Sequence, residues 1–360
     1  MARGEGMQAG ADPSVAIVNR DINPSEQLVA TYPGLACLLR NDGISRAFAA
    51  YEKSAVRWKR LYMFFGRLSL IAVMLAMVSF DYQITLKPTY GAPAFLSGLG
   101  VLFAATGLLS QILLLATHAK DRWLAARFAA ERIRCFKFQL FLVLEEEQDA
   151  EALPAKVAQR TAEGLAALQQ ELMGGRSAIL EFSPFDVLAP ARRKTGHPHK
   201  KLTDEAASVY DILRFSVETQ HFEHYSRNHD QATKFPSLLS ELSFVAGAVL
   251  ACIGILTTLL PVEGTLFHFL TNHAVVQWMD FLTWMLFVLS AVVAIHERGS
   301  AHQQNAERYV TFGREIRRIR AGAMAHMPDS FFAAVRDMEH LMLREIQDFC
   351  RDVKHSNYIF

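Results

Sequence analysis

Four apolar stretches of about 20 residues constrain this chain more than any other feature of its sequence. They lie at residues 61–82, 92–117, 242–260 and about 275–295, as two pairs. At 1.5 Å rise per residue, a helix of about 20 residues crosses a hydrocarbon core of roughly 30 Å. Peptide groups in lipid must pair within a helix or a closed barrel, and these stretches lack the alternation of barrel strands. The sequence therefore predicts an all-α polytopic membrane protein with four transmembrane helices in two hairpins.

Lysine and arginine are distributed unequally around the two hairpins. The only charged residues in the turn of the first hairpin are Asp81 and Lys87, and the turn at 261–273 has no lysine or arginine. Basic residues flank both hairpins on the other side. By the positive-inside rule, we expect both termini and the central region to lie in the cytoplasm. The first 23 residues lack the apolar core of a signal peptide, which also favours a cytoplasmic N-terminus.

Composition and helical periodicity divide the chain into seven predicted segments. These are cytoplasmic N-terminal helices (1–60), the first hairpin (61–117), a cytoplasmic helical region (118–173), a basic Pro/Gly linker (174–201), a cytoplasmic helix (202–236), the second hairpin (237–296) and cytoplasmic C-terminal helices (297–360). An apolar stripe with i, i+4, i+7 spacing runs from Phe331 to Val353. It predicts a long helix that is buried against its neighbours.

The two halves of the chain share several features in the same order. These are a polar helix with a tyrosine (Tyr51, Tyr225), a hairpin, an Ala-x-His-x-basic exit (Ala116, His118, Lys120; Ala294, His296, Arg298) and an Ala-Glu-Arg triplet (130–132; 306–308). The shared order indicates a distant duplication. Both hairpins start and end inside, so the repeat is parallel and differs from the inverted repeat of many transporters.

The second half resembles the SLATT family of two-transmembrane effectors, which are associated with bacterial nucleotide-second-messenger and SLOG sensor systems. Arg214, Gln220 and Tyr225 lie on a helix that leads into a hairpin, and an Arg/Glu-rich helix follows. This chain differs from the family pattern in having two hairpins and a long middle region. The resemblance implies an oligomeric effector of the bacterial inner (plasma) membrane. Such an effector permeabilises or depolarises the membrane in anti-phage abortive infection, with the lipid bilayer, copies of itself and a sensor protein or nucleotide second messenger as partners.

Charged side chains within the spans are costly and therefore mark candidate functional residues. Arg67 and Glu241 each lie seven residues beyond the basic residue that precedes their span, about 10 Å inside the boundary. Opposite charges at equal depth predict an ion pair between the hairpins, and the alternative is that both side chains snorkel to the headgroups. Asp280 near the outer end of the fourth span either lines a cation vestibule or is a helix-start carboxylate.

Small residues predict a close contact between the second and third spans. They form matching i, i+4, i+7 faces, which consist of Gly100, Ala104 and Gly107 on one helix and Gly247, Ala251 and Gly254 on the other. Because the faces lie at equal depth, we expect the antiparallel helices to meet there, and the alternative is that glycine is simply frequent in membrane helices. Gln111 extends the first face and would meet Ser240 or Ser243. It joins Arg67, Glu241 and Asp280 as a predicted pore or gating residue.

The sequence gives little support for enzyme chemistry. His221, His224 and His229 lie close together, but no cysteine or carboxylate pattern completes a metal site. The four cysteines are scattered, and no phosphate-binding loop or nucleophile elbow is present. We expect no catalytic residue, no cofactor, no metal and no nucleic-acid partner, since the basic runs suit anionic lipid. A constitutive small ion channel or transporter and a membrane-anchored scaffold are the alternative functions.

Overall fold

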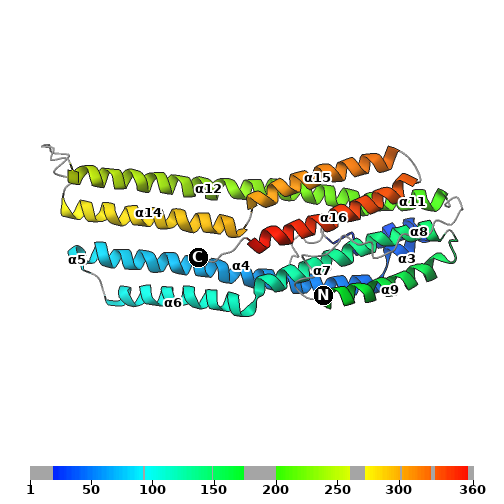
Figure 1. The fold of residues 1–360 in the computed structure, drawn as a ribbon, viewed down its shortest axis with the longest axis horizontal. Coiled ribbons are helices and arrows are strands. Elements are labelled where there is room, and N and C mark those ends of the chain that lie inside the picture. Colours follow the sequence, from blue (N-terminus) through cyan, green and yellow to red (C-terminus); the bar gives the residue numbers. More distant parts are fainter. Residues whose placement is uncertain are drawn as a thin grey trace, which may run out of the picture. The chain divides into compact units, whose positions relative to one another are not determined.

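The computed structural model describes residues 19–91, 94–147, 149–173, 200–259, 272–300, 302–325 and 329–355 (Figure 1). Every regular element in these ranges is helical, which confirms the predicted all-α class. The first half contains α2 (Glu26–Thr31), η1 (Pro33–Leu35), α3 (Ala36–Leu39), α4 (Asp42–Thr85), α5 (Lys87–Tyr90), α6 (Ala94–Thr117), α7 (Ala119–Gln139), η2 (Leu140–Leu142), α8 (Val143–Glu146) and α9 (Leu153–Met173). The second half contains α11 (Lys200–Tyr210), η3 (Asp211–Phe215), α12 (Ser216–Leu259), α14 (His273–Ser300), α15 (His302–Ala325) and α16 (Asp329–His355). Most of the predicted linker and of the second turn lies outside the described residues.

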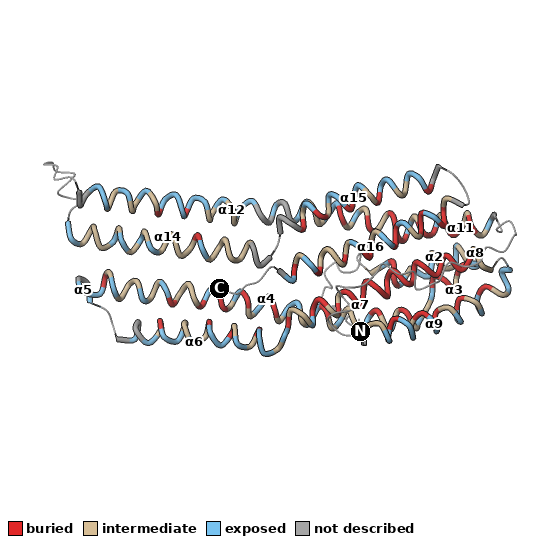
Figure 2. The backbone as a smooth tube through the Cα atoms, in the orientation of Figure 1, coloured by how far each residue is buried: buried red, intermediate tan, exposed pale blue. Residues whose placement is uncertain are grey.

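Four helices are long and apolar enough to cross a membrane, as the sequence predicts. These are α4, α6, α12 and α14. In the most apolar window of each, only 11% to 33% of the residues are buried, so most of their apolar side chains face outwards (Figure 2). An outward apolar surface of this length suits lipid and would be unfavourable in water.

Two compact units make up the chain, and α4 and α12 contribute residues to both. The first, which we call the helical unit, comprises residues 1–55, 124–227 and 306–351. The second, the membrane unit, comprises residues 56–123, 228–305 and 352–360. In the membrane unit, α4 and α6 form one hairpin, and α12 and α14 form the other (Figure 1).

The helical unit has a dense aromatic and aliphatic core. The Tyr210 ring packs edge-on against Phe138, Phe141, Phe215 and Phe331 at centroid distances of 5.3 to 5.9 Å. The apolar stripe of α16 faces this core, and Phe331, Val335, Met338, Met342, Ile346 and Val353 are buried as predicted. Helix α7 is buried on nearly all sides although it carries several charges (Figure 2). The buried charged residues of its part from Leu124 onwards, which belongs to this unit, therefore need partners there.

The helix order repeats between the two halves, in keeping with the predicted duplication. In each half, two spanning helices are followed by two further helices, in the order α4, α6, α7 and α9 and then α12, α14, α15 and α16. Helices α4 and α12 each have 44 residues. A single residue, His118, separates α6 from α7 and has a positive φ of 48°. Histidine is among the residues that tolerate this left-handed backbone, which ends the span and lets a new helix begin.

Candidate functional site

Gln111 lies inside the first hairpin. Its Nε2 donates to Ser69 Oγ at 2.8 Å, and Ser69 Oγ donates to the Gly107 carbonyl at 3.3 Å. The prediction that Gln111 meets Ser240 or Ser243 is therefore wrong within this chain. Ser240 Oγ instead donates to the Ser290 carbonyl at 3.1 Å, within the second hairpin. These hydrogen bonds thus join the two helices of the same hairpin, because consecutive antiparallel spans lie side by side.

The small-residue faces also pack within the hairpins. A Cβ on Gly107 would lie 2.9 Å from Val73 Cγ2, and one on Gly100 would lie 3.1 Å from Ser79 Cβ. A Cβ on Gly247 would lie 3.2 Å from the Phe287 ring of α14. Helix α6 therefore meets α4 and helix α12 meets α14, so the predicted α6–α12 contact is wrong within this chain.

Three other residues of the predicted faces make looser contacts. Ala104 and Ala251 are half-buried. A Cβ added to Gly254 would meet no atom within 4 Å. The tight part of each face is therefore confined to the glycines that touch the neighbouring helix.

Arg67 and Glu241 form no ion pair with each other in the described part of the chain, so that prediction is wrong within one copy. Both side chains are exposed. Glu241 makes no hydrogen bond or ion pair within the described ranges, and it lies between the exposed side chains of Leu238 and Leu242. Equal depth fixes the height of two residues on their helices but leaves the direction of each side chain open.

Asp280 is exposed near the outer end of α14. The rings of Tyr82 and Phe281, which follow Asp81 and Asp280 in the sequence, meet edge-on at 6.3 Å. The two hairpins of the membrane unit therefore touch near these carboxylates.

The helical unit contains a buried charge cluster centred on Arg214. Arg214 Nε and Nη2 donate to the two Glu339 oxygens at 2.9 and 2.7 Å, and Arg214 Nη1 donates to Glu218 Oε1 at 2.6 Å. Tyr210 Oη donates to Glu339 Oε1 at 2.6 Å, and Arg214 Nη2 lies 3.7 Å from Cys135 Sγ. We call these five residues the Arg214 cluster. They come from α7, α11, η3, α12 and α16, so the cluster joins helices from both halves.

Local helix geometry helps to place Arg214. The segment η3 is one π-helical turn between α11 and α12, and the Arg214 side chain is fully buried. The Phe138 ring lies 4.6 Å from Arg214 Cζ and covers the guanidinium. Burial opposes the charge, but Glu339 and Glu218 hold the pKa of Arg214 well above its ordinary value.

A second group of charges surrounds α7. Arg134 forms ion pairs with Glu131 at 2.9 Å and with Asp21 at 3.1 Å, and Arg127 forms an ion pair with Glu131 at 2.6 Å. Burial alone would raise the pKa of Glu131, but Arg127 and Arg134 lower it to about 2. The neighbouring His221 is kept neutral, because burial and these two arginines lower its pKa to about 4.

The two Ala-Glu-Arg triplets hold equivalent ion pairs. Arg132 on α7 bonds to both oxygens of Glu171 on α9, at 3.1 and 3.2 Å. Arg308 on α15 bonds to Glu345 on α16 at 3.2 Å. In each half, the helix after the hairpin is therefore tied to the last helix by the arginine of its triplet.

The family-like residues occupy different environments. Arg214 is buried, Gln220 is exposed and Tyr225 is half-buried, with its ring 4.4 Å from that of His221. Sequence reasoning singled out Arg214 but missed Glu218 and Glu339. The available signal was a carboxylate on the apolar stripe of α16, because Glu339 shares that face with Val335 and Met342.

These charge clusters are better suited to a structural role than to catalysis. Burial raises the pKa of the Cys135 thiol well above its ordinary value, which keeps the sulfur protonated and unreactive. In the described ranges, no group of three or more His, Cys, Asp or Glu side chains could hold a metal ion. The arginines and carboxylates neutralise one another, so the clusters lock helices together.

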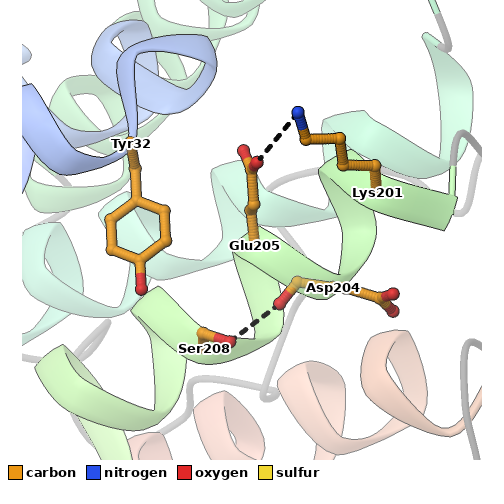
Figure 3. Close-up of a pocket in the computed structure, with 5 residues that line it drawn as sticks. All are labelled: Tyr32, Lys201, Asp204, Glu205 and Ser208. Carbon is orange, nitrogen blue, oxygen red and sulfur yellow. Dashed lines mark hydrogen bonds and ion pairs between the residues drawn. The ribbon is translucent and has the colours of Figure 1, made fainter.

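An open cavity of about 490 Å³ lies on the helical unit (Figure 3). It is lined by Tyr32, Lys201, Asp204, Glu205 and Ser208. Lys201 Nζ lies 4.0 Å from Glu205 Oε1, and Ser208 Oγ donates to the Asp204 carbonyl at 3.0 Å. The lining mixes both signs of charge on one helical face, which favours no single class of ligand.

Comparison of the chain with protein-family models, curated proteins and solved structures gave no match. The SLATT resemblance therefore depends on the layout of the helices and stays a prediction.

Proposed function

We propose that this protein is an oligomeric effector of the bacterial inner membrane that permeabilises it during anti-phage abortive infection. In this proposal both termini and the helical unit lie in the cytoplasm. A sensor protein or a nucleotide second messenger triggers assembly of several copies, and the spans then open a path for ions. The lipid bilayer and copies of the same chain are the direct partners.

Glu241 is the observation that carries the proposal. Its carboxylate lies about one and a half to two helical turns inside the span, on an exposed apolar face. A charged group at such a depth costs a few kcal/mol in lipid unless it meets a partner or water. Within the described part of one chain Glu241 has neither a hydrogen bond nor an ion pair. Assembly of several copies would supply a partner or a water-filled path.

The low burial of the spans is in keeping with assembly. Large apolar side chains are exposed along all four helices, among them Phe64, Leu108, Phe244 and Trp284. Their contact with lipid contributes no hydrophobic drive, so helix association in the membrane depends on close packing and on polar contacts. The exposed charges of Arg67 and Glu241 provide such contacts between copies.

Activation in this scheme is a population shift. A trigger moves the equilibrium only by as much as it binds the assembled state more tightly than the resting state. A change from 1% to 99% open needs a preference of about 10⁴-fold. The ion-paired helical unit is suited to this role, because a rigid unit transmits binding at its surface to the helices that enter the membrane.

The test measures membrane potential in bacteria that express the protein together with the neighbouring genes of its genome. A potential-sensitive dye reports depolarisation after phage challenge. We expect the wild-type protein to depolarise the cells and Glu241→Leu to insert normally but leave the potential intact. Leu242→Ala is the matched control, because it alters the adjacent exposed position without changing charge, and it should behave like wild type.

Each of the following results would contradict the proposal. Depolarisation without phage challenge, or dye release from liposomes that hold the purified protein alone, would point to a constitutive channel or transporter. Unchanged defence after replacement of Arg67, Gln111, Glu241 and Asp280 by leucine would point to a membrane-anchored scaffold. No depolarisation by the wild-type protein after challenge would exclude the effector function.

A further inference from the structure

A basic and aromatic cluster surrounds the polar end of the first hairpin. It comprises Arg57, Trp58, Lys59 and Arg60, which precede the first span in α4, and Arg122 and Trp123, which follow the second span in α7. We call these six residues the collar. All of them belong to the membrane unit.

Cation–π contacts join the two sides of the collar. Arg122 Cζ lies 4.7 Å from the centre of the Trp58 ring, and Arg57 Cζ lies 5.6 Å from the same ring. Two guanidinium groups from different helices therefore share one indole. Lys59 Nζ lies 5.8 Å from the Trp123 ring, which is buried and stacks on Tyr62 at 5.8 Å. These contacts hold the cations in place before any ligand binds.

Three arginines of the collar carry positive charge without a carboxylate partner in the described ranges. Arg57, Arg60 and Arg122 are exposed, and in the described ranges none of them forms an ion pair. Asp121, the acid next to Arg122, lies 3.7 Å from His118 Nδ1 instead. The arginines of α7 in the helical unit differ, since Arg127, Arg132 and Arg134 are all paired with carboxylates. The three exposed arginines of the collar therefore lack the paired carboxylate that these other arginines of the protein have.

We propose that the collar binds the phosphate of an anionic phospholipid such as phosphatidylglycerol. A guanidinium matches phosphate oxygens with two parallel N–H donors, and the Arg57 and Arg122 groups are presented together on Trp58. Tryptophan prefers the boundary between lipid and water, which is where the residues next to a span lie. A neutral phosphatidylcholine headgroup offers the same phosphate with a cation attached, and the collar repels that cation.

No tryptophan flanks the polar end of the second hairpin. The four tryptophans of the chain are Trp58, Trp123, Trp278 and Trp284, and the last two lie within the fourth span. Anionic lipid therefore anchors the first hairpin more strongly than the second. This inference needs only insertion into a membrane and is independent of the effector function.

The test measures the thermal stability of the purified full-length protein in neutral detergent. Phosphatidylglycerol, phosphatidylcholine and inorganic phosphate are titrated in separate arms. We expect phosphatidylglycerol alone to raise Tm with saturation. Each arginine near an anionic headgroup contributes about fivefold to affinity, so the double variant Arg57→Gln/Arg122→Gln should bind about 30-fold more weakly.

The matched control is the double variant Arg314→Gln/Arg344→Gln. It removes two exposed arginines of the helical unit that form no ion pair in the described ranges, and it should stay within twofold of wild type. If the collar double variant does not fold, Arg122→Gln alone should show the fivefold loss. A third variant, Arg57→Lys/Arg122→Lys, keeps the charge and should recover only part of the affinity, because lysine cannot bind phosphate in the planar two-point manner.

Each remaining outcome would overturn the proposal. Equal stabilisation by phosphatidylcholine and phosphatidylglycerol would show that the collar does not select charge. Equal stabilisation by inorganic phosphate would assign the site to a soluble anion. An equal loss in the collar and control variants would show that net charge alone attracts the lipid.

Discussion

The Arg214 cluster allows a sharp test of what holds the helical unit together. Arg214→Met leaves Glu339 and Glu218 without their cation, and the exposed fractions of these two side chains are 1% and 6%. Removal of one partner of a buried ion pair costs about 3–5 kcal/mol, because the remaining charge stays desolvated. Glu339→Gln keeps the bond between Arg214 and Glu218 and loses the charge of one acceptor. It should cost less, about 2 kcal/mol.

Cys135 provides the readout, since its sulfur is fully buried and lies against Arg214. In a background without the other cysteines (Cys37→Ser, Cys252→Ser, Cys350→Ser), a thiol reagent reaches it only when the helical unit opens. The labelling rate then follows the free energy of local opening. A loss of 3–5 kcal/mol should raise this rate between about 100-fold and 5000-fold in Arg214→Met. Glu339→Gln should raise it by about 30-fold.

A change in thiol reactivity cannot imitate the result expected for Arg214→Met. Burial raises the pKa of Cys135, and the charge of Arg214 opposes that rise. Loss of Arg214 therefore makes the sulfur less reactive, so faster labelling must come from opening. The control Arg344→Met alters an exposed arginine of α16 and should change the rate by less than threefold. Labelling of Arg214→Met as slow as that of this control would refute the reasoning.

Three further predictions follow from individual contacts. Because the pKa of folded His221 is about 4 and that of the unfolded residue is 6.5, its contribution to stability is present above pH 6.5 and is lost as the pH falls to 4. Between pH 6.5 and pH 4, the free energy of unfolding should fall by ~2 kcal/mol more in wild type than in His221→Gln, after allowance for partial exposure. Urea denaturation followed by circular dichroism measures this difference. Gly107→Leu should destabilise the first hairpin by about 1–3 kcal/mol, since even its Cβ would lie 2.9 Å from a neighbouring side chain. The control Gly254→Leu places its Cβ in open space and should leave Tm in detergent unchanged. Arg132→Met and Arg308→Met should destabilise the helical unit by similar amounts in the same urea assay, because they break equivalent ion pairs, and a difference above about 2 kcal/mol would contradict the equivalence.

The fold class followed from the sequence because hydropathy and helix length act locally. A run of about 20 apolar residues is visible without knowledge of its neighbours, and so is the stripe of α16. The contacts between elements did not follow, because depth along a helix is readable from sequence but rotation about its axis is not. The ion pair predicted between Arg67 and Glu241 is absent within one chain for this reason.

The buried clusters also show that a sequence pattern does not identify the partner of a residue. Glu339 breaks an apolar stripe, which marks it as a residue that needs a partner. The partner lies 125 positions away in sequence, and no local pattern identifies it. Gly100, Gly107 and Gly247 do pack closely against a helix, but that helix is the other half of the same hairpin. Proximity along the chain therefore outweighed the match in depth between α6 and α12.

The Arg214 cluster also shows how the two halves of the chain stabilise each other. Arg214 and Glu339 belong to the second half, whereas Cys135 and the Phe138 ring that cover the guanidinium belong to the first. A chain with only one half would leave this arginine on its surface, and a second copy would have to supply the missing α7. Fusion of the two halves makes that contact intramolecular and therefore independent of protein concentration. Accordingly, the two halves expressed as separate chains should each expose the cluster and should recover slow Cys135 labelling only when mixed. Slow labelling in the isolated first half would show that α7 is buried without its counterpart.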